Sequence, residues 1–186
     1  LIIKEMADGL SLDLVQKGIV TNQIGLSIGY DIENLKNGST GKKYNGEIQT
    51  DRYGRKIPKG ANSTINLDEY TASTRHIIEA ALALYGKIAD HTLLVRRLSI
   101  VANHVIYEKD IPNEQEIRQL DFFTDYAAEE KATKLEKEEL EREKSRQKAI
   151  LAIKNKYGKN AIVRGMSLQE GATAMERNKQ IGGHKA

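Results

Sequence analysis

The chain has 186 residues and contains no cysteine, which excludes a disulfide framework and thiolate chemistry. Hydrophobic residues account for 39% of the sequence and charged residues for 30%, and the longest apolar runs are far too short to cross a bilayer. The net charge of +3 allows an anionic partner but does not require one. We therefore expect a soluble, cytoplasmic protein with no membrane contact and a modest hydrophobic core.

The first part of the chain predicts a helix and two strands. Residues 1–17 place apolar side chains at helical spacing, and Gly18 suits a left-handed C-terminal cap. Residues 21–30 alternate apolar side chains with polar ones or glycine, which predicts a half-buried strand. A loop or irregular hairpin rich in Gly, Asn, Lys and Arg follows over residues 31–60. Residues 63–67 then predict a short second strand.

Two further elements complete the predicted domain. A broad apolar face predicts a helix over residues 71–89, with Thr71 or Ser73 as its N-cap. Residues 93–106 predict the last strand. The order helix, strand, strand, helix, strand is typical of an α+β fold in which one antiparallel sheet carries both helices on one face. We expect this domain to span residues 1–110.

The sheet face without helices is the first candidate site. Strand alternation gives it small, hydroxyl, amide and arginine side chains: Gly25, Ser27, Gly29, Thr64, Asn66, Arg97 and Ser99. A flat surface rich in hydrogen-bond donors suits a phosphate backbone, but a solvated antiparallel face shows the same pattern. Lys56 and Lys59 in the preceding basic loop, and Arg96 beside Arg97, are further candidates for phosphate contacts without base reading.

No pattern predicts a catalytic or metal-binding site. The segment GSTGKK at residues 38–43 lacks the glycine spacing and the Ser or Thr of a phosphate-binding loop. Asp68 and Glu69 are adjacent carboxylates without a third nearby, so we interpret them as a cap between strand and helix rather than as a Mg²⁺ site. The four histidines are scattered without metal-ligand spacing. The sequence therefore predicts no cofactor for this chain.

The remainder of the chain divides into a linker, a charged helix and a tail. The linker, residues 111–125, contains the peptide QLDFF, in which Leu120 and Phe123 could fill a groove on a partner or cover the domain's own core. Residues 126–157 combine helix formers and opposite charges with few apolar side chains, which predicts a solvated spacer helix rather than a coiled coil. We expect the glycine-rich tail, residues 158–186, to be ordered only in part or only when bound.

Several segments resemble the little-finger domain of Y-family translesion DNA polymerases, in the UmuC-like UV-damage-repair branch of Gram-positive bacteria. The segments that carry the resemblance are IIKEMADGL, IGLSIGYD, STINLDEYT and LLVRRLSIVANHVI. The tail is similar to the C-terminal signature of the same branch. The resemblance implies a non-catalytic portion of an error-prone DNA-repair polymerase, which grips duplex primer–template DNA with its open sheet face and with Arg96 and Arg97. Strand parity places Arg97 on that face and Arg96 at an edge or partly buried.

The peptide QLDFF is similar to the sliding-clamp-binding peptide of bacterial replication and repair proteins, with Phe122 in place of the usual leucine. The resemblance implies a tether to the sliding clamp through Gln119, Leu120, Asp121, Phe122 and Phe123. It also implies that a catalytic palm with Mg²⁺ carboxylates precedes this chain, as does the first strand of the little finger. The charged helix and tail would then serve as a spacer and as a further protein contact, such as with a recombinase filament. The alternative is a protein-interaction module whose sheet face binds an acidic protein rather than DNA.

Overall fold

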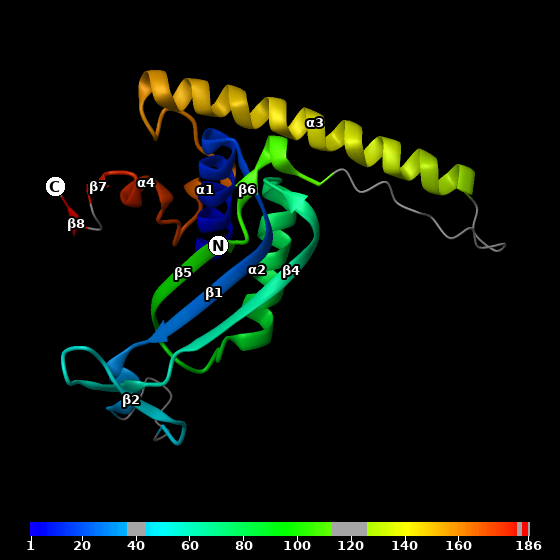
Figure 1. Cartoon of the computed structure of the whole chain (residues 1–186). Helices are drawn as coiled ribbons and strands as arrows, with labels where there is room; N and C mark the ends of the chain where they lie inside the picture. Colours follow the sequence, from blue (N-terminus) through cyan, green and yellow to red (C-terminus); the bar gives the residue numbers. More distant parts are fainter. Residues whose placement is uncertain (37–43, 113–125, 182–183, 186) are drawn as a thin grey trace.

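The computed structural model describes residues 1–36, 44–112, 126–181 and 184–185, which form an antiparallel sheet with helices on one side of it (Figure 1). The α+β fold class predicted from the sequence is confirmed. A long helix, α3 (Tyr126–Tyr157), lies at one end of the sheet, and a small hairpin that begins with β2 (Ile48–Thr50) lies at the opposite end.

The sheet is built around β1 (Ile19–Tyr30), which pairs antiparallel with β4 (Ala61–Thr71) on one side and with β5 (Val95–Asn103) on the other. The short strand β6 (Ile106–Tyr107) pairs with the start of β1. Between β5 and β6, His104 adopts a positive φ of 50°, which breaks the predicted last strand in two. β4 is longer than predicted, because its pairing with β1 continues as far as Thr71 opposite Thr21.

Helices α1 (Ile2–Lys17) and α2 (Thr74–Ile88) cover one face of this sheet. The β1 side chains that point to them are at most 4% exposed: Ile24, Leu26, Ile28 and Tyr30. They form one core with apolar residues of the two helices: Ile3, Ala7 and Leu14, and Ile77, Ala81 and Leu84. Burying each large aliphatic side chain contributes roughly 1.5–3 kcal/mol, so this layer holds both helices to the sheet. As predicted, α1 ends at Gly18, whose φ is 64°.

The interpretation of Asp68 and Glu69 as a helix cap is wrong. Both residues lie inside β4 and are exposed. Helix α2 begins at Thr74, and its N-cap is Ser73, whose Oγ accepts a hydrogen bond from the His76 N–H at 3.4 Å. Of the two caps that the sequence offers for α2, Ser73 is therefore the one whose side chain caps the helix.

Helix α3 is not a solvated spacer along its whole length, because its second half packs against α1 and bonds to the start of α2. Gln147 is only 2% exposed and donates hydrogen bonds to the hydroxyls of Ser11 and Thr74. Arg75 at the start of α2 pairs with Glu136 at 3.2 Å. These contacts are polar, so a search for an apolar stripe on α3 could not predict them.

The tail also folds back onto α1. Its described residues include the 3-10 turn η3 (Gly165–Leu168) and the short helix α4 (Ala174–Arg177). The Oε2 of Glu5 on α1 accepts hydrogen bonds from the N–H groups of Thr173 at 2.9 Å and Ala174 at 3.0 Å. Arg164 donates to Asp8 at 2.5 Å. Arg164, Thr173, Ala174 and Arg177 of the tail thus contact α1 in the unbound chain. The prediction that the tail is ordered only in part or only when bound stays a prediction.

The remaining elements are short. The 3-10 turn η1 (Ile32–Leu35) follows β1, and β2 pairs with β3 (Lys56–Pro58) inside the segment predicted as a loop or irregular hairpin. The turn η2 (Glu108–Asp110) follows β6, and β7 (Gln180–Ile181) pairs with β8 (His184–Lys185). Within the described residues, no helix is long and apolar enough to span a membrane.

Candidate nucleic-acid interface

Among the described elements, none covers the sheet face opposite α1 and α2 (Figure 1). We call this surface the open face. Cross-strand register arranges it in three rows that run from β4 through β1 to β5, and in a fourth pair that joins only β1 and β5: Asn66–Gln23–Asn103, Thr64–Gly25–Val101, Asn62–Ser27–Ser99, and Gly29–Arg97. All seven residues that strand alternation predicts for this face are therefore brought together on it. Lys56, Lys59 and Arg96 lie elsewhere.

Two glycines in β1 leave the centre of the open face without side chains from that strand. A Cβ added at Gly25 would lie 2.8 Å from Cγ2 of Val101 and 3.5 Å from Cγ2 of Thr64, so these neighbouring side chains already fill the space above the glycine. A Cβ at Gly29 would lie 3.4 Å from Cβ of Arg97. Side chains from both outer strands thus lean over β1 at these two positions.

A row of carboxamides crosses one end of the open face. The Nε2 of Gln23 donates to Oδ1 of Asn66 at 2.7 Å, and Nδ2 of Asn103 donates to Oε1 of Gln23 at 3.0 Å. The two hydrogen bonds fix the orientation of all three amides. Sequence reasoning found Asn66 but missed Gln23 and Asn103 as site residues. It also missed Asn62 and Val101. Alternation alone puts Gln23 and Asn103 on this face, so that signal was present.

Arg97 and Arg96 occupy different positions because β5 contains a bulge. Arg97 lies opposite Gly29, whereas Val95 lies opposite Tyr30, so Arg96 is an extra residue without a partner in β1. Arg97 is thus on the open face, as strand parity predicts. Arg96 lies on β5, an edge strand of the sheet, and it is not buried: its side chain is 62% exposed and pairs with Asp31 at 3.1 Å.

The ion pair between Arg96 and Asp31 changes the electrostatics of this end of the sheet. The pKa of Asp31 is lowered, first by the hydrogen bond from the Glu33 N–H and second by the Arg96 guanidinium. Asp31 is therefore ionised at neutral pH and offsets the charge of Arg96. Arg97 has no ion-pair partner within the described part of the chain. It is the cation of the open face that remains free for an anionic ligand.

Lys56 and Lys59 belong to the β2–β3 hairpin and the turn after it, not to the open face. The Nζ of Lys59 pairs with Glu47 at 2.5 Å, and this carboxylate raises the pKa of Lys59. The Nζ of Lys56 donates to Oγ1 of Thr50 at 2.8 Å. Both lysines are exposed, but the charge of Lys59 already has a carboxylate beside it. The sequence groups these lysines with the open face, and the structure separates them from it.

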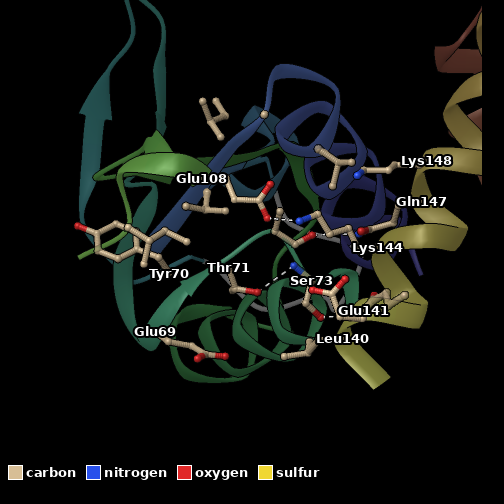
Figure 2. A pocket seen from close by; sticks show the side chains of 17 residues that line it. Glu69, Tyr70, Thr71, Ser73, Glu108, Leu140, Glu141, Lys144, Gln147 and Lys148 are labelled. Carbon is tan, nitrogen blue, oxygen red and sulfur yellow. Dashed lines mark hydrogen bonds and ion pairs between the residues drawn. The ribbon is translucent and has the colours of Figure 1, made fainter. Parts of the chain in front are cut away.

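A cleft of about 220 Å³ lies where α3 meets the end of β4 and η2 (Figure 2). Some of the charged groups that line it have partners within the chain. Lys144 pairs with Glu108, and Ser73 donates to Glu143 at 2.6 Å. The described residues contain no group of three or more His, Cys, Asp or Glu side chains that could hold a metal ion. The cleft is therefore better described as a polar contact between α3 and the rest of the domain than as a reactive site.

The clamp-binding peptide predicted at Gln119–Phe123 lies outside the described residues. The same holds for most of the linker assigned to residues 111–125. The two ends of this segment are described: η2 ends at Asp110 beside the cleft, and α3 begins at Tyr126.

The fold defines an α+β domain with one helix-covered and one open sheet face, of the kind that the sequence resemblance implies. Residues 1–122 match the family model described as the impB/mucB/samB family C-terminal domain, and the chain belongs to this family. It is also 32% identical over 127 residues to "DNA polymerase IV 2" of Bacillus subtilis (strain 168). That match covers 68% of this chain but only 26% of the relative, so the chain spans about a quarter of the protein it matches. The resemblance to the C-terminal part of a Y-family polymerase is thereby confirmed.

Proposed function

We propose that this chain is the non-catalytic C-terminal portion of an error-prone translesion DNA polymerase, and that it holds primer–template DNA through phosphate contacts. The family assignment and the relative's name, DNA polymerase IV 2, support a polymerase as the parent protein. The catalytic carboxylates and their Mg²⁺ would belong to the rest of that parent. Translesion synthesis requires a grip that tolerates damaged bases, so contacts to the sugar–phosphate backbone suit it better than contacts to base edges.

The single observation that carries the DNA-holding role is the open face itself. Gly25 and Gly29 contribute no side chains to its centre, where side chains of the flanking strands lean in, and the face carries amide and hydroxyl donors on either side. Arg97 supplies a cation without a carboxylate partner among the described residues. Neutral donors and one guanidinium can bind phosphate oxygens without distinguishing one base pair from another.

The same proposal includes the tether to the sliding clamp through Gln119–Phe123. Its support comes from the sequence, in which a glutamine, a leucine and two phenylalanines follow one another next to a charged segment. A peptide with a polar anchor and two bulky apolar residues can fill a small groove, and a few such residues carry most of the binding free energy. The tether would keep the polymerase at the primer end.

A titration of labelled duplex DNA with this chain at two salt concentrations tests the DNA-holding role. Each phosphate that the protein neutralises should contribute about −0.9 to the slope of log affinity against log salt. Binding to duplexes of unrelated sequence should be equally strong at low salt and should weaken together as salt rises. An absence of duplex binding at low salt would reject the role and leave the protein-interaction module as the better description of the open face.

A further inference from the structure

The tip of the β2–β3 hairpin is a rigid turn. The N–H of Asp51 donates to the carbonyl of Arg55 at 2.9 Å, and the N–H of Gly54 donates to the carbonyl of Asp51 at 3.0 Å. Oδ1 of Asp51 accepts the N–H groups of Tyr53 and Arg55, both at 2.9 Å. Gly54 has a φ of 77°, a conformation that other L-residues rarely adopt. These hydrogen bonds thus fix the backbone of the turn.

This turn carries an exposed tyrosine ring with two guanidinium groups over it. Tyr53 is 66% exposed. The guanidinium carbon of Arg52 lies 4.7 Å from the centroid of the Tyr53 ring, and that of Arg55 lies 5.2 Å from it. Arg52 also donates a hydrogen bond to the Tyr53 hydroxyl. We call these three residues the hairpin-tip cluster.

Of the two arginines in the hairpin-tip cluster, Arg55 pairs with a carboxylate and Arg52 does not pair with one among the described residues. Arg55 pairs with Asp51 at 2.7 Å. Burial raises the pKa of Asp51, but the hydrogen bonds from Arg55 and from the Tyr53 N–H outweigh it, so the pKa is lowered and the carboxylate stays ionised at neutral pH. Arg52 has no carboxylate partner in the part of the chain that the structure describes. The cluster therefore offers one ring and one uncompensated positive charge to solvent.

The position of the hairpin connects this cluster to the open face. β3 leads into β4 through Gly60, where an added Cβ would lie only 2.8 Å from the carbonyl oxygen of Ile28 in β1. Ile28 precedes Gly29, which lies opposite Arg97. The hairpin therefore extends from the end of the sheet that carries Arg97, and Figure 1 shows β2 beyond that end.

We propose that the hairpin-tip cluster binds an unstacked nucleobase in a single-stranded stretch of the nucleic acid whose duplex lies on the open face. This proposal rests on the proposed function for the location of the duplex. Bases stack on aromatic rings and on guanidinium planes alike, so a base can extend the stack that Tyr53 forms with the two arginines. The guanidinium groups also add cation–π attraction and a phosphate contact. A rigid turn loses little conformational entropy when the ligand binds, because its backbone is already fixed.

An isolated exposed tyrosine on a turn is often merely solvated, so the test must separate stacking from general attraction. Anisotropy titrations of the 186-residue chain would compare four probes: a blunt duplex, the same duplex with a dT extension, the same duplex with an abasic extension, and single-stranded dT. Extensions at the 5′ and the 3′ end would be measured separately. The variants are Tyr53→Ala and Tyr53→Phe, which keeps the ring but lacks the hydroxyl, with circular dichroism to confirm that both are folded.

The wild-type chain should bind the dT extension about tenfold more tightly than the abasic extension at one of the two ends, the size expected for stacking of one base. Tyr53→Ala should remove this difference and leave the affinity for the blunt duplex unchanged, while Tyr53→Phe should retain most of the difference.

Equal affinity for the dT and abasic extensions overturns the proposal, and so does a difference that survives in Tyr53→Ala. Binding of single-stranded dT that depends on Tyr53, without binding of the blunt duplex, would support the hairpin tip and reject the open face. No binding to any probe would reject both.

Discussion

The side-chain amide of Gln147 in α3 donates a hydrogen bond to the hydroxyl of Ser11 in α1 at 2.7 Å. The same amide nitrogen lies 3.0 Å from Oγ1 of Thr74 and 3.0 Å from the carbonyl oxygen of Ala72, so its two N–H groups are shared among three acceptors. These contacts join the charged helix to the two helices that back the sheet. Because Gln147 is 2% exposed, water cannot readily replace the amide.

Replacing Gln147 with alanine should therefore destabilise the docked position of α3. The change leaves the buried hydroxyls of Ser11 and Thr74 with one partner fewer, which typically costs about 1–3 kcal/mol. Chemical denaturation should show a lower midpoint, and limited proteolysis should cleave α3 faster. Ser145→Ala, at an exposed position of the same helix, is the matched control and should change neither measurement. Equal behaviour of the two variants would mean that Gln147 does not hold the helix.

Glu5 is the corresponding anchor for the tail. Its carboxylate, which has no exposed side-chain surface, accepts the N–H groups of Thr173 and Ala174 and pairs with Arg177 at 3.4 Å. Glu5→Ala should leave these donors without an acceptor and lower the free energy of unfolding by about 1–3 kcal/mol. The amide protons of Thr173 and Ala174 should exchange faster with solvent.

The control for Glu5 is Glu79→Ala, which removes an exposed carboxylate from α2. It should leave the exchange of the tail amides unchanged. Slow exchange of Thr173 and Ala174 in the Glu5→Ala variant would show that other contacts position the tail.

The elements of the core were predictable because each shows a clear period. The alternation of β1 corresponds to buried residues, and so does most of the apolar spacing of α1 and α2, although Leu82 on the predicted apolar face of α2 is exposed. The boundary between β4 and α2 was not predictable from Asp68, because cross-strand pairing extends β4 to Thr71 and places the cap at Ser73. The polar contact of α3 through the single amide of Gln147 could not be predicted from apolar spacing.

Strand parity predicted which residues lie on the open face, but it did not predict which of the nearby cations are paired with carboxylates. Parity cannot reveal that Arg96 sits in a bulge, because the extra residue is defined only by the pairing of Arg97 with Gly29 and of Val95 with Tyr30. The pairing of Lys59 with Glu47 depends equally on the fold of a hairpin that the sequence leaves irregular. Long-range partners therefore decided which of the predicted cations remain available.

Arg97→Ala should weaken duplex DNA binding about equally for all sequences. It should also make the slope of log affinity against log salt shallower by about one, because one phosphate contact is lost. Arg96→Ala is a sharp comparison: it removes a neighbouring arginine whose charge is already offset by Asp31, so its effect should be smaller. A loss of affinity that varies with base sequence would contradict backbone contacts, and equal losses in the two variants would contradict the distinction drawn from the bulge.

The double variant Leu120→Ala, Phe123→Ala should abolish binding to a purified sliding clamp while the domain stays folded. The physical reason is that bulky apolar anchors supply most of the binding free energy of a short peptide, whereas the residues between them contribute little. Surface plasmon resonance with immobilised clamp measures the loss, and Asp121→Ala in the same peptide should retain most of the affinity.

The state of the domain in this double variant separates the two interpretations of the peptide. If Leu120 and Phe123 cover the domain's own core, their loss should lower the thermal midpoint and reduce duplex DNA binding together with clamp binding, because burying such side chains contributes roughly 1.5–3 kcal/mol each. If they are offered to the clamp, the thermal midpoint and the DNA affinity should match those of the unchanged chain. Only the second outcome is compatible with a tether that works independently of the open face.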